Sequence, residues 1–346
     1  MIQSKPKHLF VLTTAFGAVA FCSSAAPQVQ QKPATGSQPK LVFGKYHLER
    51  KLVGHLRVEH LGAIKSGDGF AWTSTPKPPS YAAQEVASSI LYVDGKPSQE
   101  TTCPEGAQFP TTYLKVEGQV HPGSNLKLVV EGNWYKVKLV SGPGTEPGPV
   151  LSDEEKTWYL RSTARIKYDS DTFHQWVTDR IQRKTGEDDV HLMQRLRVMV
   201  SGYFNYANFT GPNACPDDLG EIVKEKHTLN CVKASDVLVG CARSLGIPAR
   251  IISGMILSGF NHTRAQFFVD GVGWVTTEAW DTDRSDLGHD KGDMLIMAED
   301  ADLQFPWPNH RPCNAGVGSR IVTLFPDGKI SDFATDEAPI VTKLAN

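Results

Sequence analysis

The stretch that decides the fold is residues 229–281, LNCVKASDVLVGCARSLGIPARIISGMILSGFNHTRAQFFVDGVGWVTTEAWD. Its first part places apolar residues at helical spacing, which predicts a helix with one buried stripe: Ala234, Val237, Leu238, Cys241 and Leu245. Asn230 is a favourable N-cap, and Gly246 is a favourable C-cap. Cys231 is therefore expected in the first turn, where the helix N-terminus stabilises a thiolate and offers free backbone N–H groups.

The second part of the stretch predicts a β-hairpin. Strands at 265–269 and 274–277 flank the turn sequence DGVG, in which an Asp-Gly turn and a bulge glycine are expected. With one bulged residue, the register places His262 opposite Trp280, and Glu278 becomes its diagonal neighbour on the same face. The carboxylate of Glu278 is then expected to orient the imidazole, whereas a turn without the bulge would place it on the other face.

Three residue types used in nucleophilic catalysis thus follow one another in the chain. A thiolate needs a neighbouring base, and the base needs a partner that fixes its tautomer. Cys231, His262 and Glu278 are candidates for these roles. Because core cysteines and surface histidines are common, their spacing alone leaves a structural role open.

These residues resemble the transglutaminase-like superfamily, which has a papain-related fold. The resemblance rests on Cys231, on the run GIPAR at 246–250, on His262 and on the run GWV at 273–275, and it is specific over about 225–282. It implies that Cys231 is the nucleophile and His262 the general base, with Glu278 in the place of the family's aspartate.

Three positions depart from the pattern of the family. Leu229 stands where a glycine is usual, Gln266 stands where a glutamate is common, and Glu278 is one methylene longer than the usual aspartate. If the register slips, Asp281 or Asp283 would take the place of Glu278. Because the three triad residue types are retained, an active enzyme is favoured over a degenerate copy.

The resemblance implies a cysteine-dependent enzyme that acts on peptide or glutamine-type amide bonds through a thioester. Both hydrolysis and acyl transfer are open. The alternative is a catalytically degenerate module that serves as an envelope protein-binding or structural domain. A protein or peptide substrate is expected, with no metal and no cofactor. The formal net charge of −2 argues against a nucleic-acid partner.

The N-terminus predicts export. Basic residues precede a short apolar run, Leu9–Phe21, and small residues follow it, as in a secretory signal peptide over residues 1–26. A lipid anchor at Cys22 is the alternative, which the bulky Phe21 disfavours. Residues 27–40 form a Gln- and Pro-rich linker. No later stretch is apolar enough to span a bilayer, so a periplasmic or cell-surface location is expected.

The 346 residues suggest two domains of the α+β class. Residues 41–149 show the alternation of strands and are expected to form a β-sandwich-like domain, with a hairpin that turns at 131–133. Residues 150–346 are expected to form the papain-like, transglutaminase-like catalytic domain. It opens with a capping box at Ser152 and Glu155.

Three further groups of residues have two interpretations each. The aromatic cluster could line a groove near Cys231 or belong to the core: Tyr203, Phe204, Tyr206 and Phe209. The acidic stretch lacks the spacing of a calcium loop and is expected to be a solvated face: Asp286, Asp290, Asp293, Glu299, Asp300 and Asp302. Arg250 and Arg264 are expected to be structural ion-pair partners rather than substrate clamps.

Overall fold

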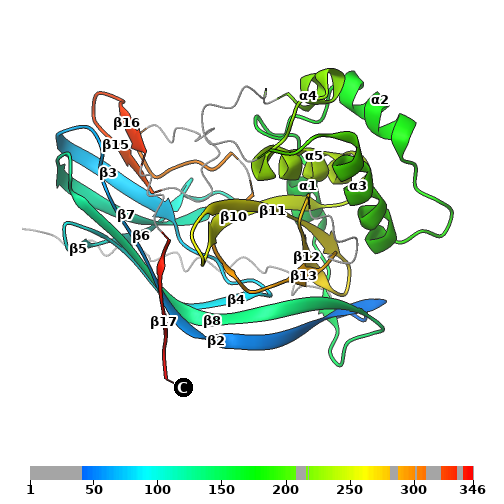
Figure 1. Cartoon of the computed structure of the whole chain (residues 1–346), viewed down its shortest axis with the longest axis horizontal. Helices are drawn as coiled ribbons and strands as arrows, with labels where there is room; N and C mark the ends of the chain where they lie inside the picture. The colour runs from blue at the N-terminus through cyan, green and yellow to red at the C-terminus, as the bar shows by residue number, and fades with distance from the viewer. Residues whose placement is uncertain are drawn as a thin grey trace, which may run out of the picture. The chain divides into compact units, whose positions relative to one another are not determined.

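The computed structural model describes residues 41–207, 216, 218–280, 287–300, 302–308, 321–332 and 338–345. Within these ranges a strand-rich first part is followed by five helices and then by further strands, which confirms the α+β class (Figure 1). Pro39–Asn346 groups as one compact unit. The predicted signal peptide at 1–26, its Cys22 and the linker at 27–40 lie outside the described residues.

The strands of the first part are β1 (Leu41–Val42), β2 (Tyr46–Ala63), β3 (Gly69–Pro76), β4 (Gln84–Val93), β5 (Lys96–Pro97), β6 (Gln99–Cys103), β7 (Thr111–Val120), β8 (Asn125–Ser141) and β9 (Gly148–Pro149). The helices are α1 (Asp153–Leu160), α2 (Asp171–Arg180), α3 (Asp189–Tyr203), α4 (Leu219–Glu225) and α5 (Cys231–Ser244). The later strands are β10 (Ala249–Ile256), β11 (Asn261–Val269), β12 (Gly273–Thr277), β13 (His289–Asp290), β14 (Met294–Glu299), β15 (Val322–Leu324), β16 (Ile330–Asp332) and β17 (Ile340–Lys343).

Two sheets enclose the core of the first part. One has the order β17-β2-β8-β4-β5, and the other has the order β16-β15-β3-β7-β6. Alternate residues of both sheets meet in one apolar cluster, as the two inner faces of a sandwich do: Leu56, Val58, Ala71, Leu91, Leu114, Val116, Leu128 and Val130. The predicted β-rich character of this region is confirmed.

The chain returns to these sheets near its C-terminus. β15 pairs with β3, and β17 pairs with β2. Leu295 and Met297 of β14 belong to the same apolar cluster as β2 and β8. Strands from before and after residue 149 therefore share these sheets. The expected domain boundary at that residue stays a prediction.

One expected turn is wrong. β8 runs without interruption from Asn125 to Ser141, through the predicted turn at 131–133. Gly132 pairs with Leu56 on one side and with Val86 on the other. A Cβ on Gly132 would approach the carbonyl oxygen of Glu85 to 2.1 Å. This glycine therefore serves close approach between two strands and not a reversal of the chain.

A second core lies between the helices and the four-stranded sheet β12-β11-β10-β14, with α5 against the sheet (Figure 1). Four of the five predicted members of the buried stripe of α5 are 0% exposed: Ala234, Val237, Leu238 and Cys241. The fifth, Leu245, is the C-cap of the helix and is only partly buried. Ser152 and Glu155 form the predicted capping box at the start of α1. The sheet holds one side of the candidate site, and α5 holds the other.

Candidate active site

Cys231 is the first residue of α5, as predicted. The side chain of the N-cap Asn230 accepts a hydrogen bond from the backbone N–H of Lys233 at 3.1 Å. The thiol of Cys231 is free and partly exposed, whereas Cys241 is buried in the stripe of the same helix. Burial raises the pKa of the Cys241 thiol well above its usual range. Of these two thiols, Cys231 is the one placed for chemistry.

His262 and Glu278 are brought together by the predicted hairpin. β11 and β12 pair Ala265 with Thr277 and Val269 with Gly273, which is the register of the bulged turn. The His262 Nε2 atom lies 2.8 Å from the Glu278 Oε2 atom. The ladder stops before His262, and Asp281 and Asp283 lie outside the described residues. Among the described residues, Glu278 is therefore the carboxylate that binds the imidazole.

The imidazole of His262 also makes a hydrogen bond with the side chain of Cys231. Burial lowers the pKa of His262, but the hydrogen bonds to Cys231 and Glu278 and the charges of both partners outweigh burial and raise the pKa to about 9. Burial also raises the pKa of Glu278, but the hydrogen bond from His262 and the charge of Arg264 lower it to about 2. His262 is thus held between a thiol and an ionised carboxylate, in its protonated form at neutral pH.

Arg264 lies two residues after His262 on β11 and binds Glu278 from the other side. Its Nε donates to the Glu278 Oε1 atom, while its Nη1 and Nη2 lie 3.3 Å from Asp290 Oδ1 and 3.0 Å from Asp293 Oδ1. The expectation of an ion-pair partner is confirmed for Arg264. It is also confirmed for Arg250, which donates to Glu299 at 2.8 Å.

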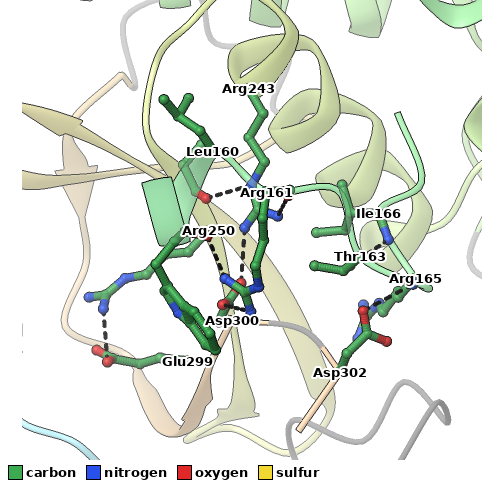
Figure 2. A network of polar contacts seen from close by, with 12 residues as sticks. Leu160, Arg161, Thr163, Arg165, Ile166, Arg243, Arg250, Glu299, Asp300 and Asp302 are labelled. Carbon is green, nitrogen blue, oxygen red and sulfur yellow. Dashed lines mark hydrogen bonds and ion pairs between the residues drawn. The ribbon is translucent and has the colours of Figure 1, made fainter. Parts of the chain in front are cut away.

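The expectation of a solvated acidic face is wrong for two members of the stretch. Asp290 is 2% exposed and binds Arg264. The side chain of Asp300 is 9% exposed and lies 2.6 Å from Arg161 and 2.9 Å from Arg243 (Figure 2). Buried arginines attract these carboxylates inward, because a buried cation needs an ionic partner. Asp286 lies outside the described residues.

The aromatic cluster divides between core and site. Tyr203 and Phe204 pack against Trp176 in the helical core. Tyr206 stacks on Trp280 with ring centroids 5.2 Å apart. Phe209 lies outside the described residues.

The hydroxyl of Tyr206 interacts by hydrogen bonds with both the backbone and the side chain of Cys231. Burial, together with the negative charges of Cys231 and Glu278, raises the pKa of Tyr206 to about 12. Its hydroxyl therefore keeps its proton at working pH and remains a donor beside the thiol.

Two of the three departures from the family pattern have structural roles. Leu229 is fully buried, and its backbone bonds to Asn205 and Ala207, which places Tyr206 beside Cys231. Gln266 accepts from the Arg250 Nε at 2.8 Å and donates to the Thr276 hydroxyl at 3.0 Å. These hydrogen bonds join Leu229 and Gln266 to residues outside the candidate triad.

Phe260, at the start of the same hairpin, is 62% exposed, and its ring lies 6.1 Å from that of His262. An aromatic side chain thus stands beside the imidazole at the surface. Sequence reasoning did not single out Phe260 or the triad contact of Arg264. The alternation of β11 could have identified Arg264, because residues two apart share one face of a strand.

A large cleft in the described part of the chain lies away from these residues. It has a volume of about 1070 Å³ and is lined by Phe109, Trp158, Tyr159 and Asp302, among others, but not by Cys231, His262 or Glu278.

In the described part of the chain, no cluster of three or more histidine, cysteine or acidic side chains is arranged to hold a metal ion. Nor is any described helix both long and apolar enough to cross a membrane.

Comparison with known proteins shows a family that the region around this site is similar to. Residues 175–279 match the model of the transglutaminase-like superfamily. A crystal structure from Cytophaga hutchinsonii, described as that of a candidate cysteine protease, is 11% identical, with a TM-score of 0.58. The alignment covers 87% of this chain and 93% of that one, which shows a shared fold.

Comparisons with a second solved structure and with curated proteins do not extend this finding. The periplasmic domain of TgpA from Pseudomonas aeruginosa is 10% identical over 70% of this chain and 88% of its own, with a TM-score of 0.36. That score is too low to support an argument. No curated protein matches the chain.

Proposed function

From the transglutaminase-like core at residues 175–279, we propose that this protein is a cysteine-dependent enzyme that acts on peptide or glutamine-type amide bonds. Cys231, His262 and Glu278 are its triad in this proposal. The observation that carries it is the position of His262, which binds the Cys231 side chain on one side and the Glu278 carboxylate on the other. A thiol, a base and an orienting group in this order are what nucleophilic catalysis requires.

The reaction begins with a proton on His262 and a thiolate at Cys231. The thiolate sulfur attacks the amide carbon, and a C–S bond forms while the carbonyl oxygen becomes an oxyanion. His262 then gives its proton to the leaving amine, the C–N bond breaks, and a thioester remains. Water or a second amine attacks the thioester, gives up its proton to His262 and releases Cys231.

Two donors are available for the oxyanion. The backbone N–H of Cys231 lies at the open end of α5, and the hydroxyl of Tyr206 lies beside the same residue. In this structure the Cys231 N–H donates to the Tyr206 oxygen, so a carbonyl oxygen that entered between them would replace that acceptor and accept from both groups. Tyr206 is therefore our candidate for the second oxyanion donor.

Glu278 serves in place of an aspartate because it is held at both oxygens. Oε2 accepts from His262, and Oε1 accepts from Arg264. A longer side chain loses more rotamer freedom when it is fixed, and two partners compensate for that loss. The proposal includes both hydrolysis and acyl transfer, and from the N-terminal sequence it places the enzyme in the periplasm or at the cell surface.

Thiol labelling tests the proposal. Limiting iodoacetamide at pH 7, followed by peptide mass mapping, should label Cys231 at least about tenfold faster than Cys241, because the thiolate is the reactive form. Cys231→Ala should abolish amide turnover, and Cys241→Ala serves as the matched control on the same helix. Equal labelling of both residues, or turnover that survives Cys231→Ala, would refute an enzyme of this class and favour a binding module.

A further inference from the structure

Arg264 has three carboxylate partners, whereas a simple ion pair has one. Its guanidinium binds Glu278, Asp290 and Asp293, and its own side chain is only 6% exposed. The hydroxyl of Tyr81 donates to the other carboxylate oxygen of Asp290 at 3.3 Å. Three carboxylates therefore bind one buried cation that contacts the candidate triad, and a phenol binds one of the three.

Asp290 is held in this position by the first part of the chain. β13 pairs with β8, with Asp290 opposite Val137 and His289 opposite Lys138. The backbone N–H of Gly292 donates to the Asp290 Oδ1 atom at 2.9 Å. Tyr81 lies between β3 and β4, so Asp290 is held by two features of residues 41–149, the strand β8 and the hydroxyl of Tyr81, in addition to its ion pair with Arg264.

We propose that Arg264 is a positioning residue for the triad, and that the N-terminal β region takes part in the active site by holding Asp290 against Arg264. The inference rests on the proposed function. It gives the β region a role: β8 and Tyr81 fix Asp290, Asp290 and Asp293 fix Arg264, Arg264 fixes Glu278, and Glu278 orients His262.

The geometry of Glu278 explains why this chain of contacts matters. Each of its carboxylate oxygens has one charged partner, so that His262 and Arg264 together fix the plane of the group. Without the guanidinium, Oε1 loses its partner, and Asp290 and Asp293 become uncompensated negative charges nearby. The backbone carbonyl of Glu278 accepts from Arg197 Nε at 3.0 Å, but this contact does not orient the carboxylate.

The charged and titratable groups around Glu278 come from several elements. β11 supplies His262 and Arg264, α5 supplies Cys231, α3 supplies Arg197, and Tyr206 follows α3. Arg264 faces Asp290, Asp293 and Tyr81 in addition. Burial lowers the pKa of Arg264, but the carboxylates outweigh burial and raise it, so the guanidinium keeps its charge at any working pH.

Arg250 provides a matched control. It lies on β10, the neighbouring strand of the same sheet, and its side chain is 5% exposed. It binds Glu299 and Gln266 and stacks on Trp274 at 4.1 Å. Replacement of either arginine disturbs a buried ion pair, but only Arg264 contacts Glu278.

The test compares Arg264→Gln, Arg264→Lys and Arg250→Gln in the full chain. NMR titration of His262 should show the wild-type pKa near 9, the value that the site geometry supports. Arg264→Gln removes a cation and leaves Asp290 and Asp293 as uncompensated negative charges, so it should raise that pKa by about one unit. Because Glu278 is then no longer held in place, the rate of Cys231 alkylation at neutral pH should fall by about tenfold. Arg264→Lys should recover part of this loss. Arg250→Gln should change the melting temperature and leave both readouts at wild-type values.

Tyr81→Phe is a second test in case Arg264→Gln does not fold, because it removes one hydroxyl and no charge. It should shift the pKa of His262 in the same direction as Arg264→Gln but by less, and it should slow Cys231 alkylation by about two- to threefold. If Arg264→Gln and Tyr81→Phe both match Arg250→Gln in these readouts, Arg264 is only structural and the inference is overturned. If wild-type Cys231 itself shows no selective alkylation, the proposed function fails instead.

Discussion

Glu278→Gln is the perturbation that examines the triad most closely. The substitution keeps the length of the side chain and removes its negative charge. In the wild type the Glu278 Oε2 atom lies 2.8 Å from His262 Nε2, and the side chain of Glu278 is 24% exposed, so the interaction is shielded from water. The imidazolium should therefore lose both a charged partner and its preferred orientation.

The magnitude follows from the pKa of His262, which rises from 6.5 to about 9 because its contacts with Cys231 and Glu278 outweigh burial. One pH unit corresponds to about 1.4 kcal/mol, and the two partners share the effect, so Glu278 contributes on the order of 1–2 kcal/mol. The population of imidazolium paired with thiolate should accordingly fall by about 5- to 30-fold in Glu278→Gln.

The assay is the rate of Cys231 alkylation across pH, together with NMR titration of His262 in both proteins. In Glu278→Gln, the pKa of His262 should be about 0.7 to 1.4 units lower, by the same conversion of about 1.4 kcal/mol per unit. Glu299→Gln, which removes the partner of Arg250 on the same sheet, is the control and should leave His262 unchanged. An unchanged His262 titration in Glu278→Gln would refute the role of the carboxylate.

Four other predictions follow from particular contacts. Gly132→Ala should destabilise the fold by about 1–3 kcal/mol in chemical denaturation, because its Cβ would clash with a backbone oxygen at 2.1 Å. Tyr206→Phe should lower kcat by about 10- to 100-fold with little change in KM, through loss of an oxyanion donor. The pKa of Glu278 is lowered to about 2, so the stability that its charge adds to the fold is present above pH 4.5 and is lost as pH falls towards 2. The pKa of His262 is raised to about 9, so the stability that its charge adds is present below pH 6.5 and is lost as pH rises through 9. The stability difference between wild type and Glu278→Gln should therefore be largest between pH 4.5 and 6.5 in thermal unfolding. A fragment of residues 150–346 should lack a cooperative thermal transition by circular dichroism, because β13, β15 and β17 lose the strands they pair with.

The local features of the site were predictable from the sequence. Asn230 identified the start of α5, and the DGVG turn with its bulge identified the register that brings Glu278 to His262. Both depend on short-range rules, in which a capping side chain or a turn residue fixes the backbone within a few positions.

The features that failed depend on contacts between distant parts of the chain. Gly132 looked like a turn residue because nothing local shows that two strands press against it. Asp290 looked solvated because its partner, Arg264, lies 26 residues away in sequence. The chemical role of Tyr206 was equally hidden, because a parallel bridge to Leu229 places it beside Cys231.

The central claim is that Cys231 forms a covalent acyl-enzyme with the help of His262. The most direct measurement is the intact mass of the protein after reaction with a p-nitrophenyl acyl ester and quenching in acid, followed by peptide mapping. The wild type should gain the mass of one acyl group, located on Cys231, and His262→Ala should reduce its rate of formation by at least about 100-fold. A wild-type protein that gains no acyl group, or that carries it on a residue other than Cys231, would contradict the account.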